Sequence, residues 1–160
     1  TPNRVLRAYQ EWFSGYGKDA EALLQKTFED VGGYSEMVTL QNIRFESYCE
    51  HHLAPIIGKI HVSYIPNGKV VGISKIARVV NIFSKRLQVQ EKLTVQIAKA
   101  LQYGLEPKGV AVFVEGEHHC MCTRGVNKAN SIMTSRSFTG CFLNDKDMRA
   151  EFYEILRKKN

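Results

Sequence analysis

The sequence predicts an α+β domain whose core is an antiparallel sheet covered by paired helices on one face. Apolar residues recur at the helical period, then at a period of two, and the alternation repeats, which gives two helices, two strands, two helices, two strands and one helix. Strands joined by short turns pair as antiparallel hairpins, unlike those of a parallel doubly wound sheet. The 160 residues contain no repeat or linker, so we expect a single domain over 1–160, with a helical part at about 1–30 and a core at about 36–160.

Two helices are expected at the N-terminus. Thr1 and Pro2 provide a capping hydroxyl and a first-turn proline, and the segment after them carries one apolar stripe at helical spacing. The glycines of residues 14–17 end this helix. A second short helix is expected over 19–28, and turn residues at 31–36 lead to the first strand.

The first strand contains a change of phase. From Met37, apolar and polar residues alternate, but the alternation reverses between Leu40 and Ile43. One extra residue in a strand has this effect, so we expect a β-bulge near Gln41 and Asn42.

The second strand is expected over 56–66. His61 lies on its polar phase, and we expect this side chain to be exposed. The turn at 66–69 leads to a short apolar run at 70–73.

The second half of the chain repeats the pattern. A capped amphipathic helix precedes a longer one, and two strands and a final helix that begins at an aspartate follow. The expected ranges are 74–86 and 88–105 for the helices, 110–122 for a strand, 123–131 for a loop, 131–142 for a strand and 145–159 for the last helix.

Composition and charge narrow the classes of protein. The formal charge of +6 and the pI of about 9.2 favour an anionic partner, such as nucleic acid, a membrane surface or a phosphorylated small molecule. No apolar run approaches the ~20 residues of a membrane helix, so we expect a soluble chain. The four cysteines are too few and too unevenly spaced for the disulfide framework of a secreted domain, which favours reduced thiols and the cytoplasm.

The stretch "CEHHLAP" begins with residues suited to a metal. Cys49 and His52 are three apart, so a thiolate and an imidazole can reach one zinc ion from a single turn. Cys120 and Cys122 lie on alternate residues of an expected strand and offer further ligands. Three ligands leave a position for water, as in catalytic sites, whereas four close a structural site. The spacing leaves both arrangements open, as well as a packing role for reduced core cysteines.

Other side chains are candidates for acid–base chemistry or for recognition. His51, His118 and His119 lie beside the candidate ligands, where an imidazole serves equally well as an acid/base or as a solvent-facing residue. Glu91, just inside the longest helix, is by default an N-terminal carboxylate, but in a pocket it can accept paired N–H donors from a heterocycle such as guanine.

Several basic residues are candidates for binding a polyphosphate. Ser74, Lys75 and Arg78 lie at the start of a helix, where unpaired amides and the dipole favour anions. Each is individually more typical of a solvated surface charge. The remaining candidates are Arg4 and Arg7 on the first helix and Arg124 beyond the cysteines.

Four separated motifs together carry a family resemblance. The stretches "SYCEHHLAP", "GISKIARVV", "RLQVQEKLT" and "HHCMCTRGV" occur in an order and spacing that closely resemble the GTP cyclohydrolase I family, over almost the whole chain. The resemblance implies the tunnelling fold (T-fold), in which subunit sheets join into a ring barrel and two pentameric rings form a homodecamer with interfacial active sites. It also implies hydrolysis of GTP at purine C8, release of formate and rearrangement to 7,8-dihydroneopterin triphosphate, the first step of pterin and tetrahydrofolate synthesis.

The resemblance implies a role for most of the candidate residues. One zinc ion per subunit would be held by Cys49, His52 and Cys120. The catalytic residues would be His51 as the acid at purine N7, His118 beside C8 and the ribose, and Ser74 near the ribose ring. The guanine would be bound by Glu91 and Gln90, and the triphosphate by Lys75, Arg78 and Arg124, with Arg4 and Arg7 supplied by a neighbouring subunit. No family role is implied for Glu50, His119 or Cys122.

Two other hypotheses are set against this one. A paralogue on the same fold that acts on another purine or pterin should have lost part of the set His51, Glu91 and Arg124, and none is missing. A nucleic-acid-binding module with a structural zinc would favour a closed four-ligand site and aromatic residues among the basic ones. The basic residues instead gather around the proposed site, so we expect neither a nucleic acid nor a membrane as partner, and any regulatory partner stays unidentified.

Overall fold

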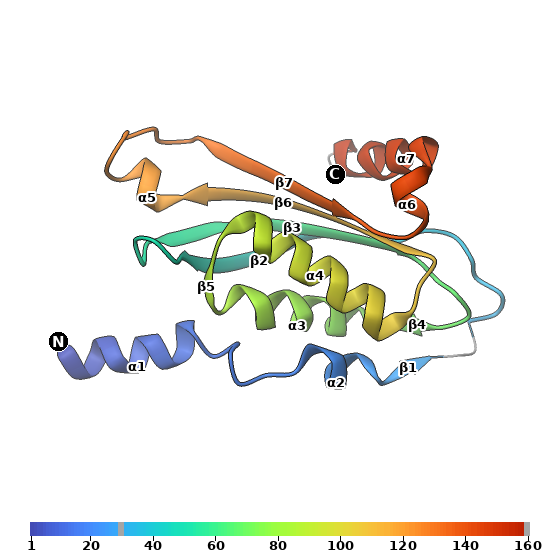
Figure 1. Cartoon of the computed structure of the whole chain (residues 1–160), viewed down its shortest axis with the longest axis horizontal. Coiled ribbons are helices and arrows are strands. Elements are labelled where there is room, and N and C mark those ends of the chain that lie inside the picture. Colours follow the sequence, from blue (N-terminus) through green and yellow to red (C-terminus); the bar gives the residue numbers. More distant parts are fainter. Residues whose placement is uncertain (29–30, 159–160) are drawn as a thin grey trace.

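The computed structural model describes residues 1–28 and 31–158 and is built on a five-stranded sheet with the order β5-β2-β3-β6-β7 (Figure 1). The long strands pair antiparallel, and only the short β5 runs parallel to its neighbour. The predicted α+β class and both hairpins are therefore confirmed. The strands are β2 (Val38–Cys49), β3 (Pro55–Ile65), β5 (Leu87–Gln88), β6 (Gly109–His118) and β7 (Ile132–Phe138).

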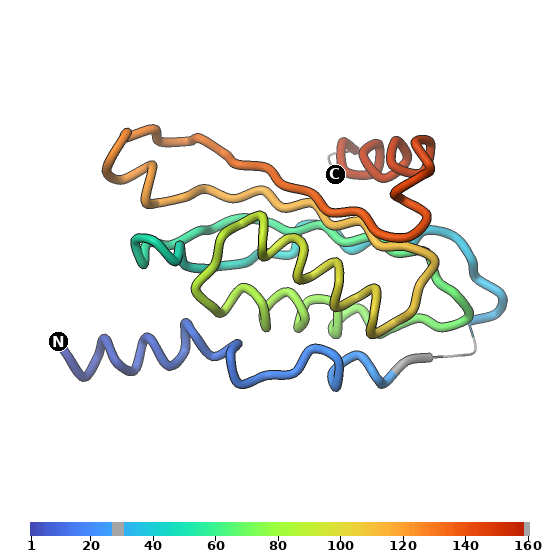
Figure 2. Tube along the Cα trace, viewed as in Figure 1, coloured from blue at the N-terminus to red at the C-terminus, as the bar shows by residue number. Residues whose placement is uncertain are grey.

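One face of the sheet is covered by two helices, α3 (Ile73–Ser84) and α4 (Gln90–Leu105), which lie side by side below it in Figure 2. Their apolar stripes pack against alternate side chains of the long strands, as the period-two pattern requires. The fully buried side chains of this core include Phe45, Ile60, Val62, Ile76, Val79, Leu93, Ile97, Val112 and Val114.

The opposite face of the sheet carries a second, smaller core at one end. There α6 (Cys141–Asn144) and α7 (Lys146–Arg157) bury Phe142 and Phe152 against Ile65 and other strand residues. The expectation that helices cover only one face was therefore incomplete, because α7 returns over the opposite face.

The N-terminal part contains α1 (Pro2–Trp12), α2 (Ala20–Leu24) and the short β1 (Thr27–Phe28), which pairs with β4 (Val70–Val71). The helix predicted over 19–28 was therefore too long, because its last residues form a strand. Asp19 caps α2 by accepting hydrogen bonds from the two amides that follow its first residue.

The predicted bulge is present, and it buries a histidine. The β2–β3 register shifts between Leu40 and Ile43, and Asn42 adopts a left-handed φ of 57°. The Asn42 amide donates to Nδ1 of His61, and the Nε2 atom of His61 lies 3.1 Å from the Glu115 carboxylate. The expectation that His61 is exposed was wrong, since only 5% of this residue is accessible. At this point, a side chain on the polar face of the strand contacts the bulge instead of solvent.

Both strands of the second hairpin are shorter than predicted. β6 ends at His118 and is followed by the four-residue helix α5 (His119–Cys122), so the two cysteines do not lie on a strand. β7 ends at Phe138, because Gly140 turns the chain with a φ of 54° and lies too close to the backbone of Lys108 to carry a side chain. Residue 159 of the last predicted helix lies outside the described residues. Over 1–28 and 31–158, no helix is both long and apolar enough to cross a membrane.

Candidate active site

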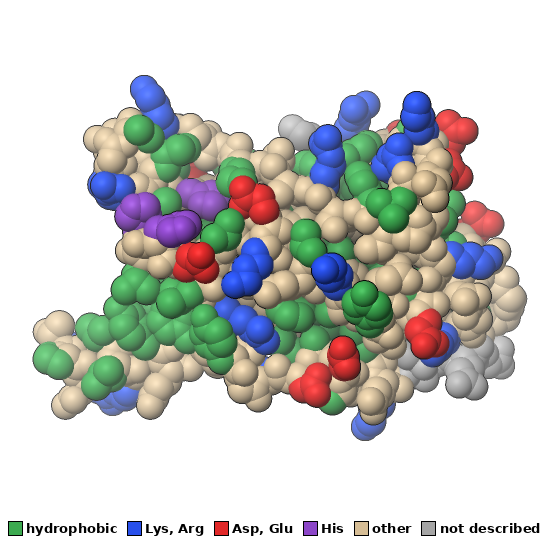
Figure 3. Space-filling view, in the orientation of Figure 1, with side chains coloured by type: hydrophobic (Ala, Val, Ile, Leu, Met, Phe, Trp, Pro, Cys, Tyr) green, Lys and Arg blue, Asp and Glu red, His purple; other side chains and the backbone are tan. Residues whose placement is uncertain are grey.

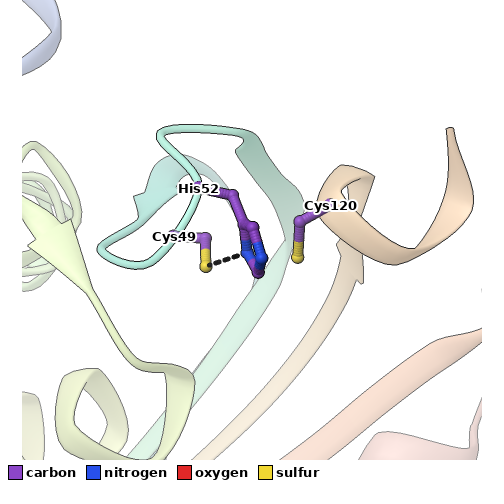
Figure 4. Close-up of side chains that lie close together, drawn as sticks. All are labelled: Cys49, His52 and Cys120. Atoms are coloured by element: carbon purple, nitrogen blue, oxygen red, sulfur yellow. Dashed lines mark hydrogen bonds between the residues drawn. The ribbon is translucent and has the colours of Figure 1, made fainter. Parts of the chain in front are cut away.

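A compact group of two cysteines and one histidine lies at one end of the sheet (Figure 4). Cys49 ends β2, and His52 follows in the turn to β3, where Leu53 donates its amide to the Cys49 carbonyl. Cys120 comes from α5, which follows the strand paired with β3. One potential ligand atom from each of Cys49, His52 and Cys120 lies within 4.8 Å of the other two.

The spacing of these atoms suits a tetrahedral zinc ion. Zinc bonds of about 2.3 Å to sulfur and about 2.05 Å to nitrogen, at a tetrahedral angle, place the two atoms about 3.6 Å apart. The observed distance from Cys49 Sγ to His52 Nδ1 is 3.6 Å. Among the described residues the group has three members and does not include Cys122. The donor set therefore fits a metal with one position free for another ligand.

Burial and nearby groups change the pKa of the Cys120 thiol. Burial and the adjacent Cys49 raise the pKa of Cys120, and the Arg124 guanidinium partly offsets this. Arg124 donates from Nη1 to the Cys120 carbonyl at 3.2 Å, so the structure brings this predicted residue to the metal group. A bound cation would favour the thiolate strongly over the thiol.

His51 lies beside the metal group but faces solvent. Its Nδ1 atom is 3.7 Å from Cys49 Sγ, its Nε2 atom is 3.9 Å from a Glu50 carboxylate oxygen, and 65% of its side chain is exposed. His119 is engaged elsewhere, with its Nε2 atom 3.3 Å from a Glu117 carboxylate oxygen. The histidine side chains visible on this face gather at one end of the molecule, to the left in Figure 3.

A second group of predicted residues lies at the same end, where α4 begins. Gln90 is buried, and its side-chain oxygen lies 2.8 Å from Nε2 of His118. Burial lowers the pKa of His118, and the Glu91 carboxylate, which follows Gln90 in the chain, partly opposes this. The Glu91 residue itself is exposed.

Sequence reasoning missed part of this second group. Thr94 and Ser135 are hydrogen-bonded to each other at 2.7 Å, and both contact Gln90. Thr94 lies one helical turn after Gln90, which is a signal that the sequence carries. Ser135 belongs to β7, and no local pattern connects it with α4.

The remaining predicted residues lie away from the metal group of the same chain. α3 starts at the end of the sheet opposite Cys49 and runs back toward β5, which pairs with Tyr48 and Cys49. Its twelve residues span about 18 Å. Ser74 and Lys75 are therefore at the far end of this helix, and Arg78 lies half-way along it.

The surroundings of these residues are basic. Lys75 and Arg78 line a cavity of about 550 Å³ beside α2, together with Lys18 and Lys26. Among the described residues of its lining, the one acidic side chain is Asp19.

Arg4 and Arg7 are exposed on α1, which projects beyond the sheet (Figure 1). The helix is joined to the body of the molecule near the metal group, since Trp12 stacks on Tyr48 with ring centroids 5.0 Å apart. The Nε atom of Arg7 donates to the Asn3 carbonyl of its own helix at 3.4 Å. Neither arginine contacts the metal group.

Fold and site together define a T-fold protein with a metal-competent Cys₂His group at one end of its sheet. A solved structure, the archaeosine synthase QueF-Like in its apo form, supports the fold with a TM-score of 0.54 at 22% identity, over 65% of this chain and 93% of that one. The family model of GTP cyclohydrolase I matches residues 1–157. The chain therefore belongs to the GTP cyclohydrolase I family of enzymes.

Curated relatives agree with this assignment. The chain is 58% identical over 158 residues to the GTP cyclohydrolase 1 of Maricaulis maris, covering 99% of this chain and 77% of the relative. It is 49% identical over 159 residues to that of Rickettsia bellii, covering 99% and 83%. The resemblance found in the four motifs is thus confirmed.

Proposed function

We propose that the protein is a zinc-dependent GTP cyclohydrolase I, which hydrolyses GTP at purine C8, releases formate and forms 7,8-dihydroneopterin triphosphate. The observation that carries this proposal is the position of the Cys₂His group at the same end of the sheet as His51, His118 and Glu91. Cys49, His52 and Cys120 would hold one zinc ion, which when bound supplies Lewis-acid activation of water near neutral pH.

The surrounding side chains have distinct roles in this proposal. His51 donates a proton to purine N7, because attack at C8 moves electron density onto that nitrogen. Its exposed ring next to Cys49 suits this role. His118 moves protons at C8 and the ribose, and the Glu91 carboxylate accepts the paired N–H donors that distinguish guanine from adenine.

The triphosphate would be bound across a subunit interface. Arg124 lies at the metal end, whereas Ser74 and Lys75 lie at the start of α3 and Arg78 lies at its middle, with Lys75 and Arg78 lining the basic cavity. In this proposal one chain supplies the metal end and a neighbouring copy supplies the second group, including Arg4 and Arg7 from its α1.

The sheet offers a way to build such an interface. Over the described residues, β7 pairs only with β6, and most of β2 has a strand partner on one side only. Two different free edges favour head-to-tail pairing of copies, which closes into a ring. We propose a homodecamer of two such rings, located in the cytoplasm, as a single domain of the T-fold over 1–160.

The alternative functions have weaker support. A nucleic-acid-binding module with a structural zinc would need a fourth ligand, and the group found among the described residues has three. The following experiment distinguishes the proposed enzyme from a paralogue that acts on another purine. Zinc-loaded protein is incubated with GTP, and formate and a fluorescent oxidised pterin are measured. Formation of both supports the proposal, and absence of product with full zinc occupancy favours the paralogue.

A further inference from the structure

The Gln90 side chain has a fixed orientation inside the protein. Its Nε2 atom donates to the Met133 carbonyl at 3.0 Å and to Ser135 Oγ at 3.1 Å, and it lies 3.4 Å from the Val114 carbonyl. Carbonyl oxygens only accept hydrogen bonds, so the amide nitrogen must face them and the amide oxygen must face His118. No part of Gln90 is exposed, and therefore solvent offers no alternative partner.

The surrounding hydrogen bonds form a consistent chain of donors. Gln90 donates to the Ser135 hydroxyl, which can donate to Thr94, and Thr94 donates to the Gln90 carbonyl at 2.7 Å. Gly116 leaves the room for this arrangement, since a Cβ atom there would lie 2.6 Å from Gln90 Oε1. The amide is therefore held by α4, β6 and β7 together.

This orientation determines which nitrogen of His118 carries a proton. The Gln90 oxygen can only accept, and it lies 2.8 Å from His118 Nε2, so Nε2 must be the donor. In a neutral imidazole the other nitrogen, Nδ1, then has a free lone pair. No described residue forms a hydrogen bond with Nδ1 of His118.

We propose that Gln90 is a positioning residue that holds His118 in the Nε2–H tautomer and leaves Nδ1 as the proton acceptor toward substrate. This role differs from the contact with guanine that the family resemblance implies for Gln90, because its amide groups are already engaged inside the chain. The tautomer is a property of the protein alone, and only its kinetic consequence rests on the proposed hydrolysis of GTP.

The tautomer is measured directly in zinc-loaded protein labelled with ¹⁵N-histidine. Solid-state NMR distinguishes protonated from unprotonated ring nitrogens, and a His118→Asn variant assigns the His118 signals. We expect a protonated Nε2 and an unprotonated Nδ1 in the wild type. A proton on Nδ1 of the wild-type protein overturns the proposal, and this measurement needs no variant of Gln90 to fold.

Two variants separate positioning from structural support. Gln90→Met keeps the side-chain length but removes the acceptor, so we expect a mixture of His118 tautomers and a kcat lower by about 10- to 100-fold, with KM changed by less than about threefold. Gln102→Met makes the same substitution further along α4, where the amide bonds the Pro107 carbonyl and Thr139 instead of His118, and we expect it to retain the wild-type tautomer and kcat.

The outcomes distinguish the possible failures. An equal loss of kcat in both variants, or an unchanged kcat in Gln90→Met, overturns the positioning role. If wild-type protein makes no product from GTP but shows the Nε2–H tautomer, the proposed function fails and the assignment of the tautomer stands.

Discussion

Gly116 tests whether the buried site around Gln90 is as tightly packed as the structure indicates. A methyl group in Gly116→Ala would lie 2.6 Å from Gln90 Oε1 and 3.1 Å from Ile56 Cγ2, whereas ordinary contacts begin at 3.4 Å. The amide must therefore move by about 0.8 Å, and its hydrogen bond with His118 cannot keep its length of 2.8 Å. Overpacking of a core costs about 1–3 kcal/mol, and the lower entropy of the unfolded alanine chain returns about 0.4–1 kcal/mol.

We expect Gly116→Ala to lower the free energy of unfolding by about 1–2 kcal/mol and to lower kcat. Urea unfolding at one fixed protein concentration gives the first quantity, because the proposed association of subunits would make stability depend on concentration. Gly17→Ala is the matched control, since a Cβ at Gly17 meets nothing within 4 Å. Wild-type stability and wild-type kcat in Gly116→Ala would refute the packing argument.

Three further predictions concern the metal group, the acid and the bulge. Cys120→Ser should lose most bound zinc by elemental analysis, whereas Cys122→Ser should retain it, and equal zinc content in the two variants would contradict the assignment of ligands. His51→Ala should keep its zinc but lose about 10²- to 10⁴-fold in kcat, and unchanged turnover would count against its role as an acid. His61→Phe should lower the free energy of unfolding by about 1–3 kcal/mol in urea, because the bulge amide loses its buried acceptor; an unchanged midpoint would show that the histidine does not hold the bulge.

The sequence predicted those features of the fold that depend on local pattern. Its periodicity placed the long helices and strands, and its reversal of phase located the bulge at Gln41 and Asn42. Patterns of this kind cannot reveal contacts between distant segments. The burial of His61 depends on the bulge in one neighbouring strand and on Glu115 in the other, and β5 is too short to show any period.

The same distinction between local pattern and distant contacts applies to the candidate site. Cys49 and His52 were predictable because they share one turn, whereas the choice of Cys120 over Cys122 came from the family resemblance and not from spacing. Alternate residues lie on one side of a strand and on different sides of a helix, and the chain forms a helix there. Spacing alone therefore could not decide between three and four ligands.

The two histidines proposed for proton transfer are held in opposite ways, and this difference bears on the proposed order of the chemistry. His51 has an exposed ring that lies near Cys49, the His52 ring and a Glu50 carboxylate 3.9 Å away, so it can exchange protons with solvent and supply an acid at the start of each turnover. His118 is half-buried, and the Gln90 amide restricts it to a single tautomer. A ring held in this way suits proton transfers after the purine ring has opened, when the substrate must stay aligned and the direction of transfer matters more than contact with water.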